Sequence, residues 1–210
     1  MNHKHINIST LQLDVEQEFL AKLKLLTPYF ESRMNGATAH QMQSIAPADQ
    51  KYKLNYGISL GDMKLLAESI KSVNIINFTR VDYDKLWCTN IREAMLLALL
   101  NTPETLITPE RIEAWINSIP TQEMAELLPF LFSWKSSDPH KTLSIAIDSY
   151  PTAHTIQRIA HTYTIGRLIQ HNKLNPSSND IQSYISLTKS NTPSPLEATS
   201  IAFLTNLLLQ

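Results

Sequence analysis

Apolar residues recur along this chain at spacings of three and four, with polar residues between them, which is the pattern of amphipathic helices. The clearest case follows Thr108, where Ile112, Trp115, Ile116 and Ile119 share one helical face. Similar segments extend along the rest of the chain, separated mostly by short links. We therefore expect an all-α fold with nine to eleven helices, in which consecutive helices pack antiparallel.

The predicted helix starts carry residues that cap N-termini. Thr, Asp or Ser directly followed by Pro suits such a start, because the missing N–H of Pro has no intrahelical partner in the first turn. The predicted starts are Thr27-Pro28, Thr108-Pro109, Asp138-Pro139 and Ser194-Pro195, together with Ser59, Thr121 and Thr152. Residues 44–57, which contain Pro47 and Gly57, are predicted to form an irregular link.

From about residue 90 the predicted helices come in pairs of roughly 40 residues, a period typical of HEAT-type repeats. No composition shift or linker divides the chain. We therefore expect residues 1–210 to form a single domain, a HEAT-like α-solenoid with a concave face.

Composition favours the same fold class. The chain has 28 Leu and 21 Ile but only three Val and four Gly. Leu favours helices, whereas sheets use more Val and hairpin turns use more Gly. The sequence also lacks a phosphate-binding glycine loop, a Gly-x-Ser-x-Gly elbow and a His-Glu-x-x-His metal motif.

Other cofactor and membrane classes are disfavoured as well. His154, His161 and His171 lack the i, i+4 spacing of helical metal ligands, and we expect no metal and no cofactor. The single cysteine, Cys88, excludes an intramolecular disulfide and favours a reducing cytoplasm. The longest apolar run, Ala94 to Leu100, is far shorter than the ~20 residues that span a bilayer, so we expect no membrane partner.

The charges are balanced overall but distributed unevenly. The chain has 18 Lys and Arg against 19 Asp and Glu, so no global positive field favours nucleic acid. Residues 139–210, however, hold five basic and three acidic residues. This excess belongs either to an ordinary solvated surface or to a mildly positive concave face. Lys64 belongs to a second small basic stripe, with Lys51, Lys53 and Lys71.

Three stretches, taken in order, resemble the HEAT-like-repeat DNA alkylation-repair glycosylases. Tyr56 to Leu66 contains a Gly-hydrophobic helix start followed by a Lys-Leu turn, and Leu86 to Leu100 contains Leu-Trp, Arg-Glu and an Ala/Leu helix. Ile107 to Ile116 then leads into the apolar helix that follows it. The resemblance covers roughly residues 52–205 and rests on the order and spacing of all three stretches.

This resemblance implies a reaction that requires few catalytic groups from the protein. The family hydrolyses the N-glycosidic bond of positively charged alkylated purines in double-stranded DNA. The cationic base is already a good leaving group, so the protein must supply a carboxylate for the oxocarbenium-like sugar, aromatic faces and basic groups for phosphates. The base need not enter a deep pocket.

The resemblance also implies site residues. The family motif Trp-Asp-x-x-Asp corresponds here to the run from Gln122 to Glu126. Glu126 takes the position of the catalytic Asp, which keeps the charge and adds a methylene, and Glu123 supplies the other acidic residue. Gln122 takes the position of the DNA-contacting Trp.

The remaining predicted contacts with DNA lie elsewhere in the chain. Arg158 matches the phosphate-binding Arg of the family, and Phe203 matches its second Trp. We add Lys64 from the basic stripe as a further DNA contact.

Three interpretations follow. The first is a DNA-repair glycosylase, or a relative that binds alkylated or distorted duplex DNA without catalysis, with Arg158 and Glu126 in a concave groove. The second is a non-enzymatic helical-repeat scaffold that binds a protein partner through an apolar groove. The third is an enzyme of another kind on the same scaffold. In each case we expect a cytoplasmic monomer.

Overall fold

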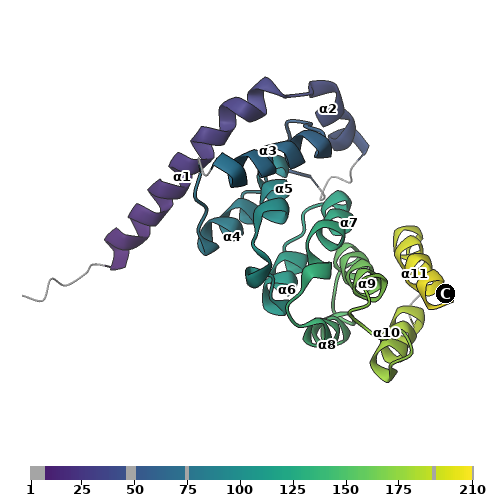
Figure 1. Cartoon of the computed structure of the whole chain (residues 1–210). Helices are drawn as coiled ribbons and strands as arrows, with labels where there is room; N and C mark the ends of the chain where they lie inside the picture. Colours follow the sequence, from purple (N-terminus) through teal and green to yellow (C-terminus); the bar gives the residue numbers. More distant parts are fainter. Residues whose placement is uncertain (1–7, 46–50, 74–75, 191–192, 210) are drawn as a thin grey trace, which may run out of the picture. The chain divides into compact units, whose positions relative to one another are not determined.

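The computed structural model describes residues 8–45, 51–73, 76–190 and 193–209, and most of these residues lie in helices (Figure 1). The only β-type contact in these ranges is an isolated bridge between Leu54 and Ile91. No helix within them is long and apolar enough to cross a bilayer. The all-α prediction is confirmed.

The described part of the chain contains eleven α-helices and two 3-10 helices. They are α1 (Ile8–Ser32), α2 (Gly36–Ile45), α3 (Leu60–Val73), α4 (Arg80–Cys88), α5 (Arg92–Asn101), η1 (Glu104–Leu106), α6 (Pro109–Asn117), α7 (Gln122–Leu131), η2 (Ser133–Lys135), α8 (Pro139–Ser149), α9 (Thr155–Gln170), α10 (Asn179–Ser190) and α11 (Pro195–Leu208).

The helices form two compact units. The first comprises Met1–Ile45 and Lys53–Ala98, and the second comprises Ala46–Tyr52 and Leu99–Gln210. The division falls inside α5, within an apolar run that carries no linker-like residues.

In the first unit, the predicted helix break at Thr27-Pro28 is wrong, because α1 continues through Pro28. The Thr27 hydroxyl donates to the carbonyl of Leu23 at 3.1 Å. Leu26 and Phe30, on either side of the proline, are both buried. Packing of these side chains therefore keeps the helix together where local sequence alone predicts its end.

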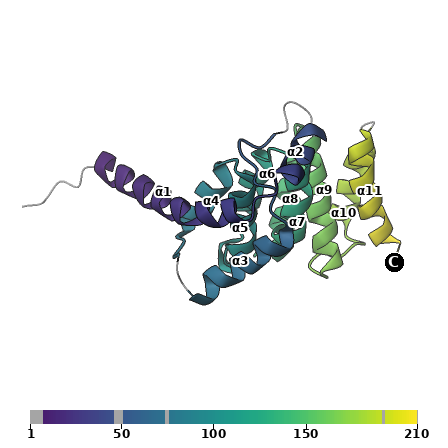
Figure 2. The ribbon, with the colours of Figure 1, turned by 90° about the horizontal axis from the view of Figure 1, so that it is seen from above.

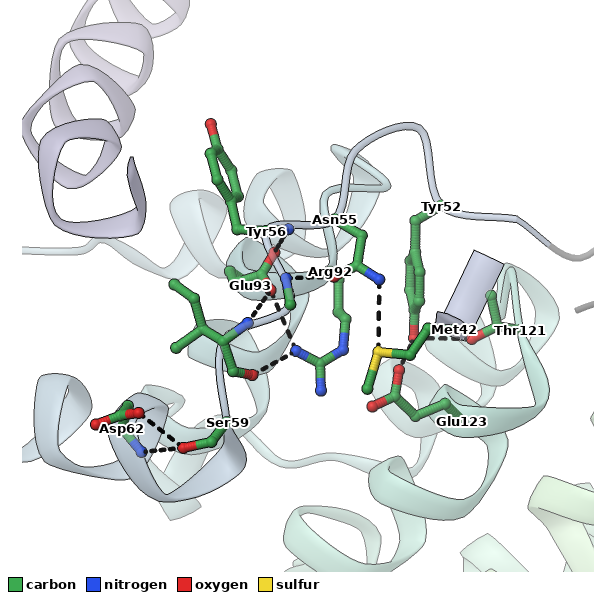
Figure 3. A network of polar contacts seen from close by, with 12 residues as sticks. Met42, Tyr52, Asn55, Tyr56, Ser59, Asp62, Arg92, Glu93, Thr121 and Glu123 are labelled. Carbon is green, nitrogen blue, oxygen red and sulfur yellow. Dashed lines mark hydrogen bonds and ion pairs between the residues drawn. The ribbon is translucent and has the colours of Figure 1, made fainter. Parts of the chain in front are cut away.

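A buried ion pair fixes the irregular segment before α3. Arg92 and Glu93 are 3% and 0% exposed, with 3.1 Å between Arg92 Nη1 and Glu93 Oε1 (Figure 3). Glu93 also accepts from the backbone N–H groups of Tyr56 and Ile58, and Arg92 donates to the Ile58 carbonyl at 2.8 Å. Buried charges require such partners. Residues 51–57 are irregular, as predicted, whereas Ser44 and Ile45 belong to α2 and 46–50 lie outside the described residues.

Most of the predicted caps are confirmed. The side-chain oxygens of Ser59, Thr108, Thr121, Asp138 and Ser194 accept from the backbone N–H three residues later. These bonds satisfy donors that the first helical turn leaves without partners. The helix predicted to start after Thr152 begins at Thr155.

The second unit has two layers of helices. One layer contains α6, α8 and α10, and the other contains α7, α9 and α11 (Figure 1). Within each layer successive helices are in contact, and α9 also contacts α6 and α8 of the other layer. Helices α9 and α11 lie side by side in both views (Figure 2).

Contacting side chains show that α7, α9 and α11 are parallel. Phe130 contacts Arg167, and Trp134, in the turn after α7, contacts His171. In each pair the second residue follows the first by 37 positions. The two segments therefore run parallel. The same relation holds between α9 and α11, through the pairs Arg158–Glu197 and Gly166–Phe203.

Candidate functional site

Packing leaves α9 a narrow exposed surface. Nine of its residues are buried: Ile159, Ala160, His161, Thr162, Thr164, Ile165, Gly166, Leu168 and Ile169. Beyond its first turn the helix reaches solvent only through Tyr163, Arg167 and Gln170. Spacings of four and three put these side chains on one face. Any group that α9 offers to a ligand past its first turn therefore lies along this stripe.

Arg167 joins three helices. The carbon of its guanidinium lies 4.9 Å from the ring centre of Phe130 in α7 and 5.1 Å from that of Phe203 in α11. Its Nη1 donates to Oε1 of Gln170 at 2.7 Å. Among the described residues no carboxylate pairs with Arg167. The guanidinium therefore lies between two aromatic rings, in a cation–π arrangement that leaves its charge available to an anion.

A carboxylate lies on the same surface. Glu126 is exposed one turn before Phe130 in α7, and Gln122 Nε2 donates to Glu126 Oε1 at 2.9 Å. The Tyr163 ring lies 5.4 Å from that of Phe203. Burial and the negative charge of Glu126 raise the pKa of Tyr163, and the positive charge of Arg167 acts in the opposite direction. Both charges thus act on one phenol. We call the surface formed by Gln122, Glu126, Phe130, Tyr163, Arg167 and Phe203 the α7–α9–α11 surface.

A glycine allows α11 to approach α9. A Cβ added at Gly166 would lie 2.5 Å from Cε1 of Phe203, which is closer than such atoms come in proteins. The missing side chain therefore lets the Phe203 ring rest directly on α9, beside Tyr163 and Arg167.

The structure brings together three of the predicted site residues, Gln122, Glu126 and Phe203. Glu123 has a different environment, because its Oε2 accepts from the hydroxyl of Tyr52 at 2.6 Å (Figure 3). The Tyr52 oxygen in turn accepts from Thr121, the residue that caps α7. Glu123 thus contributes to the start of α7. Lys64 lies exposed on α3 of the first unit.

Arg158 points to another side of α9. It precedes Tyr163 by five residues, which is about 140° around a helix. Its Nε donates to the carbonyl of Tyr150 at 3.2 Å, and its Nη1 lies 3.6 Å from Oε1 of Glu197, a buried carboxylate. The charge of Arg158 is therefore paired between helices, and its predicted role with phosphate stays a prediction. The arginine on the α7–α9–α11 surface is Arg167, which the sequence analysis missed.

A cleft of about 480 Å³ adjoins this surface beside Phe203. Amide side chains alternate there with apolar ones, and its lining residues are Ile169, Gln170, Asn172, Pro176, Phe203, Asn206 and Leu207. The amides can both donate and accept hydrogen bonds. The cleft thus presents hydrogen-bonding amides and apolar side chains next to each other.

His161 belongs to the core rather than to a metal site. Its Nε2 lies 3.5 Å from Oε2 of Glu113, whose other oxygen accepts from Ser149 at 2.7 Å. Burial lowers the pKa of His161, and Glu113 acts in the opposite direction. Within the described ranges no group of three or more His, Cys, Asp or Glu residues is arranged to hold a metal ion.

Comparison with known proteins yields no relative of this chain. No family model matches it, and neither a curated protein nor a solved structure does.

Because α11 approaches α9 closely at Gly166, we predict that Gly166→Ala destabilises the fold. Alanine is the better helix former by about 1 kcal/mol, but its methyl group must displace the Phe203 ring. We expect a net loss of about 1–3 kcal/mol in the free energy of unfolding, measured by urea titration.

Gly61→Ala is the matched control, because a Cβ at Gly61 in α3 meets its nearest neighbour at an ordinary 3.7 Å. We expect that variant to be neutral or slightly stabilised. Equal stability of the Gly166 variant and the wild type would contradict the packing of Phe203 on α9.

Proposed function

We propose that this chain binds duplex DNA through the α7–α9–α11 surface and hydrolyses the N-glycosidic bond of alkylated purines there. One observation carries the proposal: a carboxylate, an arginine that no described carboxylate pairs with, and three aromatic rings gather on three successive helices of one layer. These are the groups that DNA binding and stabilisation of a cationic sugar require.

The arrangement of the second unit supports a HEAT-like solenoid. Its helices form two layers, and neighbours in the α7–α9–α11 layer are parallel. The 37-residue offset between α7 and α9 is close to the HEAT period of roughly 40 residues. In this proposal the α7–α9–α11 layer is the concave side, which a duplex would contact along several repeats.

Arg167 is the proposed phosphate contact. Its guanidinium is held between the rings of Phe130 and Phe203, so little side-chain freedom remains to be lost when a phosphate binds. The same rings provide apolar faces for the sugars of the strand. Phosphate contacts position a duplex without reading its sequence, as a lesion-directed protein requires.

Glu126 is the proposed catalytic carboxylate. Gln122 donates a hydrogen bond to Oε1 of Glu126. None of the described residues donates to Oε2 of Glu126, so that oxygen can accept a hydrogen bond from water. The C1′–N bond breaks with its electron pair moving onto the base, which neutralises the positive charge of the base. Water then adds to C1′, and its proton passes to Glu126. Until that step the carboxylate stabilises the cationic sugar.

Replacing Arg167 with Gln is expected to weaken duplex affinity about tenfold and to lower the slope of log affinity against log salt by about one. Fluorescence anisotropy with a labelled duplex at several salt concentrations measures both quantities. Lys189→Gln removes one exposed positive charge from α10 in the other layer and is the matched control, expected to bind like the wild type. Equal losses in the two variants would mean that only net charge matters, against a specific contact.

Replacing Glu126 with Gln is expected to reduce release of 7-methylguanine or 3-methyladenine from methylated duplex DNA by at least about 100-fold, while leaving the fold intact. Mass spectrometry of the free bases measures this. Glu123→Gln is the control on the same helix, because Glu123 is engaged by Tyr52. Release at the wild-type rate by the Glu126 variant, or no release by folded wild-type protein, would contradict the catalytic part of the proposal.

A scaffold that binds a protein partner is the second candidate function. The ring of Phe130 is 45% exposed on the same surface, and such a ring also suits an apolar partner. This candidate predicts no salt-dependent affinity for DNA, so the anisotropy titration separates the two functions.

A further inference from the structure

Two aromatic rings stack just beyond the α7–α9–α11 surface. The indole of Trp134 in η2 and the imidazole of His171, which caps the C-terminus of α9, have centres 4.1 Å apart and planes 16° from parallel. The 37 residues between them equal the separation of Phe130 and Arg167, one turn earlier along the same helices. The stack thus continues the row of paired side chains that forms the candidate site.

Positive charge gathers around this stack. The Nζ atoms of Lys135 and Lys173 lie 5.5 Å and 5.9 Å from the ring centre of Trp134. In the part of the chain that the structure describes, neither lysine forms an ion pair with a carboxylate. Two like charges near one ring repel each other, and an anion bound between them would remove that repulsion.

The ring stack and the two lysines together indicate a class of ligand. An anion alone would need the lysines but not the stacked rings, and an apolar ligand would need the rings but not the lysines. A nucleotide has both a phosphate and a flat base. Since the faces of paired bases inside a duplex are covered by their neighbours, an unpaired base is better able to add to a ring stack than a base within a helix.

We propose that Trp134, His171, Lys135 and Lys173 bind an unpaired nucleotide of a DNA strand. The base stacks on the exposed imidazole of His171, which already rests on the indole, and the adjoining phosphates lie near the two ammonium groups. This inference rests on the proposed function and deepens it: the preferred substrate is a duplex with an unpaired segment next to the part bound by Arg167.

The test uses the intrinsic fluorescence of Trp134. The other two tryptophans, Trp87 and Trp115, are each 2% exposed, so quenching by added oligothymidylate reports on Trp134. Oligothymidylate is a suitable probe because its bases are unpaired. Anisotropy of the labelled oligonucleotide gives the affinity in parallel, and titration with inorganic phosphate alone shows what an anion contributes.

The expected result is quenching by oligothymidylate, with affinity about tenfold lower in Trp134→Leu and largely retained in Trp134→Phe, which keeps a ring. The double variant K135Q/K173Q leaves the stack in place and is expected to bind about as weakly as the Leu variant. Unchanged affinity in that double variant, or equal quenching by phosphate alone, would overturn the proposal.

A blunt duplex separates this inference from the proposed function. Arg167→Gln should lower the affinity for the blunt duplex and leave the affinity for oligothymidylate unchanged. Trp134→Leu should lower the affinity for oligothymidylate and leave that for the blunt duplex unchanged. Failure of the blunt duplex to bind would refute the proposed function while leaving the nucleotide site supported. Loss of both ligands in Trp134→Leu, with its melting temperature unchanged, would contradict a separate site.

Discussion

The enclosure of α9 determines what the second unit can offer to a ligand. This helix contacts α6, α7, α8 and α11, so nearly every residue after its first turn is buried. Dense packing of this kind fixes side-chain positions closely. The glycine at position 166 brings α11 close enough for Phe203 to join the stripe on which Tyr163 and Arg167 reach solvent. The candidate site is the part of α9 that its neighbours leave open.

The two arginines of α9 illustrate how their surroundings distinguish a paired charge from one without a carboxylate among the described residues. Arg158 faces the buried Glu197 and the end of α8, where an unpaired charge would be strongly unfavourable. Arg167 instead lies between two rings on the partly exposed side, where water solvates a charge that no described carboxylate neutralises. The charge of Arg158 is therefore paired within the fold, whereas the charge of Arg167 has no described carboxylate beside it.

Local sequence predicts the helices well, because caps and apolar periodicity act within a few residues. Thr108, Thr121 and Ser194 cap the helices that they were expected to cap. The predicted break at Pro28 is wrong because packing against the rest of the first unit outweighs the local preference of proline.

The site was predicted only in part, because it depends on which helix faces are covered. The resemblance selects Glu126 and Phe203 by two separate matches, and these two do share a surface. The resemblance also selects Arg158, and a linear pattern does not reveal that α8 and α11 enclose its side of α9 while Arg167 lies on the open side. The Trp134–His171 stack needs the register of two helices 37 residues apart, which the sequence does not display.

The central claim is that the α7–α9–α11 layer is the DNA-binding face. Hydroxyl-radical footprinting tests it most directly, because Phe130, Tyr163 and Phe203 are reactive aromatic side chains on that surface. With duplex DNA bound, their oxidation should fall, while Ile147 and Leu187 in the other layer should be oxidised as before. Protection of Ile147 and Leu187 instead, or no protection of the three rings at saturating DNA, would contradict the account.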